Sequence, residues 1–181
     1  MRRLGIVLAA LILVLPASAA SINPKLFVLS SADVPRGYDF DPSNSLLLSK
    51  ATVDRARNEE GRLLRRAGLQ GAYLATYINV APPKWRFVHS GAYVFRDRAG
   101  VQAFLRLGKS AQLPLITPRG HHIDFGDEAW LYRSPAPDDA TTIVWRYRNV
   151  VAYVSCEEMA GQRAIVLQLA RKQQRRIVAA S

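Results

Sequence analysis

The sequence contains a single cysteine, Cys156, among its 181 residues. A lone cysteine excludes an intramolecular disulfide, so packing and hydrogen bonds have to hold the fold together. About 160 residues follow the N-terminal segment described below, which is enough for one domain with a hydrophobic core. Cys156 shares one strand face with Val150, Ala152 and Val154. This pattern favours a buried thiol, with a reactive cysteine as the alternative.

Long hydrophobic runs are missing too. The main apolar run, Leu4–Leu15, is shorter than the roughly 20 residues that span a bilayer. Arg2 and Arg3 precede it, and the small residues Ala17-Ser18-Ala19 follow it, as in a secretory signal peptide. We therefore predict a signal peptide at residues 1–19, a single domain at residues 20–181, and a secreted, extracytoplasmic protein. A retained membrane anchor is the alternative.

Acidic residues are scarce. The chain has 14 Asp and Glu against 25 Lys and Arg, a net charge of +11. This excess favours anionic partners, such as an acidic polymer or a membrane surface, and export makes nucleic acid a poor candidate. A solvated cationic surface without a partner is the alternative. The residues predicted to form an anion-binding patch are Arg146, Arg148, Arg171, Lys172, Arg175 and Arg176.

Motifs for phosphate loops, dinucleotides, zinc proteases and serine hydrolases are absent, and no cofactor is predicted. The densest group of potential ligands lies in residues 121–128, where His122, Asp124, Asp127 and Glu128 are candidate metal ligands. His122 and Asp124 share a face of an extended strand, although catalytic zinc typically needs three protein ligands. In the alternative interpretation, these residues form a turn whose carboxylates bind backbone N–H groups or a nearby arginine.

The strongest structural pattern is a β-hairpin over residues 141–157, with its turn at Arg148-Asn149. One register sorts the side chains of both strands onto two consistent faces. In that register Tyr147 faces Val150, Trp145 faces Ala152, Ile143 faces Val154 and Thr141 faces Cys156.

The remaining pattern predicts one antiparallel sheet with helices packed on it, the α+β class. A short strand at Tyr38–Phe40 precedes a loop at Pro42–Ser45. The longer predicted elements are helices at Ser49–Ala67, 97–107 and 159–178, and strands at Gln70–Val80, Trp85–Arg96, His121–Phe125 and Glu128–Arg133.

Four short sequence segments are similar to segments of small secreted bacterial domains: Ala32–Tyr38, Ala67–Tyr73, Gly126–Ala129 and Trp145–Val151. Together they resemble the extracytoplasmic sensor-like and lipoprotein domains of the PsbP/Mog1 type of α/β/α sandwich. The resemblance implies a non-catalytic accessory, binding or sensing module. It brings no functional residues to this chain, and lipid anchoring does not carry over because the signal region has no cysteine.

The sequence thus predicts a secreted, non-catalytic binding, sensing or accessory module of the bacterial cell envelope, which contacts anionic partners through a basic surface. The alternative is a metal-dependent enzyme that uses the residues from His121 to Glu128.

Overall fold

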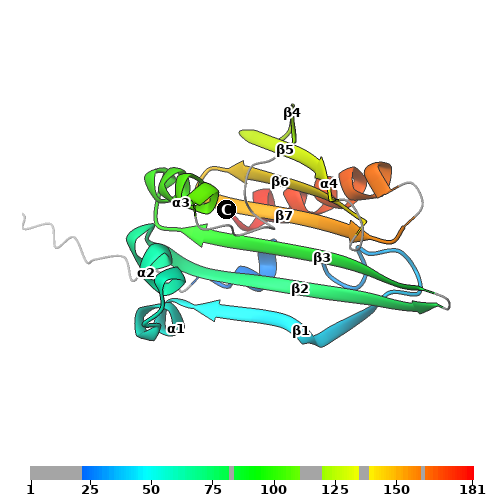
Figure 1. The fold of residues 1–181 in the computed structure, drawn as a ribbon, viewed down its shortest axis with the longest axis horizontal. Coiled ribbons are helices and arrows are strands. Elements are labelled where there is room, and N and C mark those ends of the chain that lie inside the picture. Colours follow the sequence, from blue (N-terminus) through cyan, green and yellow to red (C-terminus); the bar gives the residue numbers. More distant parts are fainter. Residues whose placement is uncertain (1–21, 82–83, 111–119, 135–138, 160–161) are drawn as a thin grey trace, which may run out of the picture.

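The protein folds around one seven-stranded antiparallel sheet in the strand order β1-β2-β3-β7-β6-β5-β4 (Figure 1). The structure is a computed structural model that describes residues 22–81, 84–110, 120–134, 139–159 and 162–181. The predicted signal peptide lies outside the described residues. The strands are β1 (Asp39–Ser49), β2 (Leu69–Ala81), β3 (Lys84–Phe95), β4 (His121–Ile123), β5 (Glu128–Arg133), β6 (Ala140–Tyr147) and β7 (Val150–Glu157).

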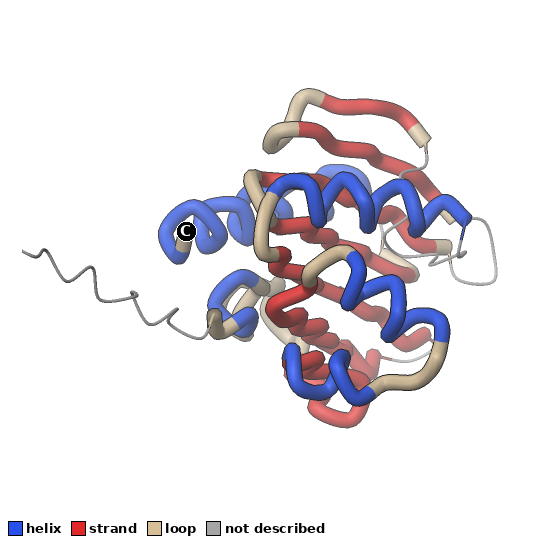
Figure 2. Tube along the Cα trace, turned by 90° about the vertical axis from the view of Figure 1, so that its left-hand side faces the viewer, coloured by secondary structure: helices blue, strands red, loops and turns tan. Residues whose placement is uncertain are grey.

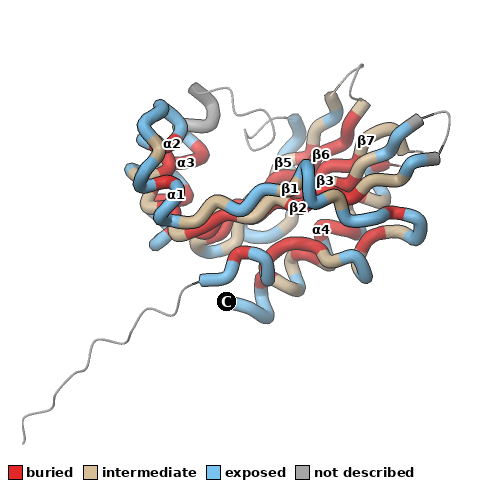
Figure 3. The backbone as a smooth tube through the Cα atoms, turned by 90° about the horizontal axis from the view of Figure 1, so that it is seen from below, coloured by how far each residue is buried: buried red, intermediate tan, exposed pale blue. Residues whose placement is uncertain are grey.

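Helices pack on both faces of this sheet (Figure 3), which confirms the predicted α+β class. No helix in the described part of the chain is long and apolar enough to span a bilayer. The helices are the 3-10 helix η1 (Pro24–Phe27), α1 (Lys50–Arg55), α2 (Glu59–Arg66), α3 (Arg98–Ser110) and α4 (Gln162–Ala180).

The predicted hairpin is confirmed as β6 and β7 in the middle of the sheet, and its register is the predicted one. Its turn is fastened to β3, because the Asn149 side chain donates to the Phe95 carbonyl at 2.7 Å. The Phe95 N–H in turn donates to the Asn149 carbonyl at 2.9 Å. The central hairpin therefore holds neighbouring strands in place on both sides.

The two faces of the hairpin belong to two hydrophobic cores. Trp145 and Val154 pack beneath α4, together with Leu169 and Ile177 of that helix. Val144, Val151 and Tyr153 face the other way, toward α2 and α3. Both strands are buried on both faces, which accounts for their nearly continuous apolar sequence.

Two glutamines, buried Gln173 and half-buried Gln174, fix α4 to the sheet. Gln173 accepts a hydrogen bond from the Ser90 hydroxyl at 2.8 Å and donates to the Gly91 carbonyl at 2.9 Å. Gln174 accepts from the Trp145 indole N–H at 2.7 Å. These polar residues interrupt the apolar stripe of α4, and their hydrogen bonds offset the cost of burying them.

The helix predicted over Ser49–Ala67 is wrong as a single helix. Ser49 does cap α1, accepting from the Thr52 N–H, but Ala56 is extended and ends that helix. Asn58 then caps α2 through a 2.9 Å hydrogen bond from the Gly61 N–H. A second strong N-cap residue inside the predicted segment therefore starts a new helix.

The loop predicted at Pro42–Ser45 is instead an irregularity within β1, which continues from Asp39 to Ser49. The register with β2 shifts between Asp41 and Leu46, and the Asp41 carboxylate accepts from the Ser43 N–H. Ser45 accepts from the Thr76 N–H at 3.0 Å, so β2 holds the irregular segment at the edge of the sheet. Smaller differences are that α4 begins at Gln162 and that β4 ends at Ile123.

Candidate functional site

A groove of about 1160 Å³ opens beside the N-terminal half of α4. It forms because α4 packs mainly on β6 and β7, whereas β5 and β4 continue the sheet beyond the helix (Figure 1). Leu131 and His121, which are cross-strand partners on β5 and β4, line it from the sheet side. The volume is somewhat larger than the roughly 300–1,000 Å³ typical of small-molecule pockets.

Apolar side chains form much of the groove. Leu131 of β5 is largely buried, with 6% of its surface exposed. Ala164 and Leu167 lie three residues apart on α4, so both present to the groove from the same side of the helix. Met159, which precedes α4, adds a flexible thioether. This lining favours the apolar part of a ligand.

Hydrogen-bonded polar residues fix the rim. The Thr141 hydroxyl donates to the side-chain oxygen Oε1 of Gln162 at 2.8 Å, and the side-chain Nε2 of Gln162 donates to the main-chain carbonyl of Asp139 at 2.7 Å. Arg133 forms an ion pair with the Asp139 carboxylate at 2.6 Å. Arg163, also on the rim, is exposed and makes no hydrogen bond or ion pair within the described chain. Its guanidinium is therefore available to a polar or anionic group of a ligand.

The candidate metal ligands form the turn of the alternative interpretation. The Asp127 carboxylate accepts from the Arg148 N–H at 2.9 Å, and Glu128 forms a 3.2 Å ion pair with Arg146. Asp124 is exposed, and His122 has an edge-to-face ring contact with Trp130. Nowhere in the described ranges do three His, Cys, Asp or Glu side chains gather closely enough to hold a metal ion. Asp127 and Glu128 thus make the contacts expected of the turn interpretation, and the metal site stays a prediction.

A row of polar side chains that sequence reasoning missed crosses the other face of the sheet. His89 bonds Thr76 through Nδ1 at 3.1 Å and pairs with Glu157 through Nε2 at 3.2 Å. Ser155 lies opposite His89 in the β3–β7 register but hydrogen bonds Thr142 at 2.8 Å. Because both nitrogens of His89 are engaged, the row is a structural network rather than an activated serine. The signal that could have identified this polar row is the strand register, which aligns its residues once the strand order is known.

The six residues of the predicted anion-binding patch do not lie on one surface. Arg146 is on the α3 side of the sheet, with 13% of its side chain exposed, whereas α4 covers the opposite side. Lys172 and Arg176 are tied to Asp33, the first through its carbonyl and the second through its carboxylate. The exposed members are Arg148 at the β6–β7 turn and Arg171 and Arg175 on α4.

Cys156 is fully buried in the core beneath α4. Burial raises the pKa of its thiol to about 12, so the thiolate does not form at neutral pH. The predicted buried thiol is confirmed.

Comparison with known proteins gives one structural likeness. No protein-family model matches the sequence, and no curated protein matches it. Among solved structures, the chain is similar to the extracellular domain of PknH from Mycobacterium tuberculosis, with a TM-score of 0.49 and 9% sequence identity. The match covers 86% of this chain and 97% of the PknH domain.

Proposed function

We propose that this protein is a non-catalytic binding or sensing module of the bacterial cell envelope, and that it holds its ligand in the groove beside α4. The observation that carries the proposal is the groove itself, an apolar surface next to a rim of fixed polar groups. Ligand sites commonly combine these two features, because apolar contact supplies affinity and a few placed polar groups supply orientation.

The chemistry of the lining supports binding rather than catalysis. His121 is the lining histidine on β4, and it is exposed at the sheet edge. Thr141 donates its hydroxyl to Gln162, and the Arg133 guanidinium is held by Asp139. In this arrangement the polar groups position one another, as expected for a preformed rim that recognises a ligand without transforming it.

The ligand most compatible with this lining is a small molecule with an apolar body and a polar or anionic end. The apolar body would lie along Leu131, Ala164 and Leu167, and the charged end would meet Arg163. Export of the domain, predicted from residues 1–19, would expose the groove to envelope components of this amphipathic kind.

Filling the groove tests the proposal. An anilinonaphthalene sulfonate dye, which combines an aromatic body with an anionic group, serves as the probe. We expect the Ala164→Trp variant to bind this dye at least tenfold more weakly than the original protein, because the indole would occupy the apolar surface.

The matched control is Ala179→Trp, the same exchange at an exposed position in the last turn of α4. At about 1.5 Å per residue it lies roughly 22 Å along the helix from Ala164. It should leave dye affinity unchanged, and melting curves should show both variants folded. Equal dye binding by the two variants would mean that the groove is not the binding site.

A further inference from the structure

The net positive charge of this chain comes from the segments that contain α1 to α4. Residues 50–66, 96–109 and 162–180 together carry 15 basic and four acidic side chains, an excess of 11. The rest of the chain carries ten basic and ten acidic side chains and is neutral. A cationic surface that merely kept the protein soluble would not need this separation.

Most of this excess gathers at one end of the sheet. Residues 50–66 and 96–109, which contain α1, α2 and α3, hold ten of the basic and all four of the acidic side chains. These three helices lie at the same end as the β6–β7 turn (Figures 1 and 2). We call this region the arginine-rich end and define it by six exposed residues: Arg57, Arg62, Arg66, Arg98, Arg106 and Arg148.

Five of these six arginine side chains are not used to hold the fold; the exception is Arg148, whose guanidinium lies over the Tyr147 ring. Arg57, Arg62, Arg66, Arg98 and Arg106 make no hydrogen bond or ion pair within the described chain. Their neighbour Arg65 shows the contrast, because it donates to the Val53 and Ala56 carbonyls.

Helix stability accounts for Arg66, in the last turn of α2, but not for Arg98. Arg98 is the first residue of α3, where the positive end of the helix dipole disfavours a cation. Two of the four carboxylates are already paired with cations of the same end, Asp54 with Lys50 and Asp97 with Arg96. The others, Glu59 and Glu60, are exposed in the first turn of α2, where the dipole favours acidic groups.

We propose that the arginine-rich end docks onto the surface of an anionic phospholipid bilayer. The cations come from α2, α3, the connection between α1 and α2, and the β6–β7 turn, so they spread over a broad end of the molecule that suits an extended surface. Apolar side chains accompany them: Leu46 and Leu47, just before α1, are 49% and 47% exposed. Cations beside exposed apolar groups are typical of proteins that bind membranes peripherally.

Vesicle binding with two matched triple variants tests this docking. The probe is phosphatidylcholine vesicles with about a third phosphatidylglycerol, compared with phosphatidylcholine alone. The original protein should bind only the anionic vesicles, and its binding should weaken as salt rises. The Arg62→Gln, Arg66→Gln, Arg98→Gln variant should lose about a hundredfold in affinity, given about 1 kcal/mol per cation.

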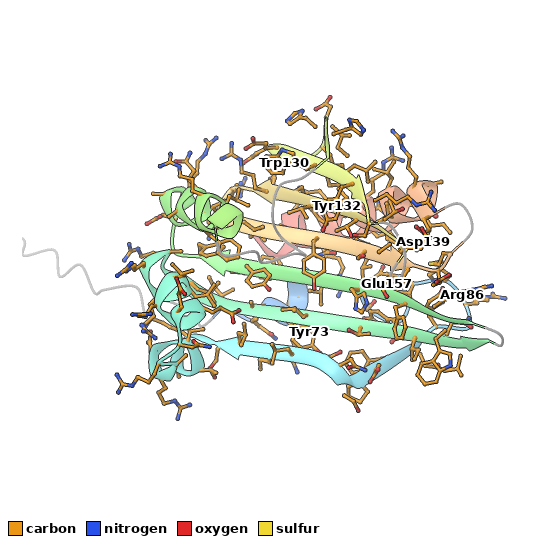
Figure 4. All side chains as sticks on the ribbon, in the orientation of Figure 1. Tyr73, Arg86, Trp130, Tyr132, Asp139 and Glu157 are labelled. Carbon is orange, nitrogen blue, oxygen red and sulfur yellow. The ribbon has the colours of Figure 1, made fainter. Side chains whose placement is uncertain are left out.

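The control variant removes the same charge elsewhere. Arg36, Arg86 and Arg171 are exposed and make no hydrogen bond or ion pair within the described chain, and Arg86 lies at the opposite end of the sheet (Figure 4). Changing all three to Gln should weaken vesicle binding less than about threefold. Equal losses in both triple variants would show that net charge alone acts, which overturns the proposal. Binding to soluble polyglycerol phosphate without binding to anionic vesicles would overturn it in favour of a polymer partner.

Discussion

Asp33 is the residue that joins the segment before β1 to α4. Its carboxylate accepts hydrogen bonds from the N–H and hydroxyl of Ser30 and pairs with Arg176 at 3.2 Å. Burial raises the pKa of Asp33, but the Ser30 hydrogen bonds and the charges of Arg176 and Lys172 outweigh it and hold the pKa below its ordinary value of 3.8. A lowered pKa means that the charged carboxylate stabilises the fold.

We expect Asp33→Asn to lower the free energy of unfolding by about 1–2 kcal/mol at neutral pH, because the amide loses the ion pair and one set of acceptors. The stabilisation by Asp33 is present above its unfolded pKa of 3.8 and is lost as pH falls through the lower pKa of the folded state, so the two proteins should begin to converge only below about pH 4. Urea unfolding at several pH values measures this. A deficit that stays constant into acid would contradict the ionic role.

Cys156 makes the stability of the fold depend on pH in the alkaline range, as Asp33 does in the acid range. Burial raises its pKa from 9.0 to about 12, so the folded state keeps the proton that the unfolded state gives up. Its contribution to stability is therefore full below about pH 9 and declines as pH rises toward 12. A thiol reagent at pH 8 should label the folded protein at least a hundredfold more slowly than the urea-unfolded protein. Rapid labelling of folded protein would show that the thiol is accessible, and Cys156→Ala is the unlabelled control.

At the scale of elements, the Tyr153 ring on β7 lies so close to the backbone of β3 that it explains why residue 91 is a glycine. A Cβ atom added at Gly91 would lie 2.1 Å from Cε1 of Tyr153, far inside contact distance. The ring thus covers the Gly91 backbone and fills the space that a side chain would take.

We expect Gly91→Ala to lower the free energy of unfolding by about 2–3 kcal/mol, because the Tyr153 ring has to leave its place. In a Tyr153→Val background the same change should cost less than about 1 kcal/mol, a coupling that a double-mutant cycle by urea unfolding measures. If Gly91→Ala costs the same in both backgrounds, the ring is not what excludes the side chain.

The strands could be predicted from the sequence because residues alternate between two faces along each strand, and the faces of paired strands have to match. The β6–β7 register follows from matching faces over eight residues on each side of a two-residue turn. The helix boundaries were harder, because two cap residues, Ser49 and Asn58, compete within one apparently helical segment. The irregularity in β1 depends on hydrogen bonds from Thr76, 31 residues away from Ser45, which no local turn signal contains.

Sequence patterns could not predict the candidate site, for a related reason. The groove combines Leu131 of β5, Thr141 of β6 and Leu167 of α4, and only the strand order brings them together. The sequence singled out residues 121–128 for their potential metal ligands. The carboxylates of this segment serve the turn beside Arg146 and Arg148, and the predicted basic patch failed to assemble because α4 and Arg146 lie on opposite sides of the sheet.

For the whole molecule, the two proposed surfaces are well separated. The groove lies beside the start of α4, whereas the arginine-rich end lies at α1, α2 and α3 (Figure 1). A domain docked through the arginine-rich end would therefore keep the groove away from the membrane and open to a ligand. Ala164→Trp should accordingly leave vesicle binding unchanged, and the Arg62→Gln, Arg66→Gln, Arg98→Gln variant should leave dye binding unchanged.

The most direct measurement of the central claim, that the groove beside α4 binds the ligand, is amide hydrogen exchange of the full chain with and without the dye. We expect the dye to slow exchange in β5 and in the first two turns of α4, and Ala164→Trp to remove that protection. Protection confined to other elements, or protection that persists in Ala164→Trp, would contradict the claim.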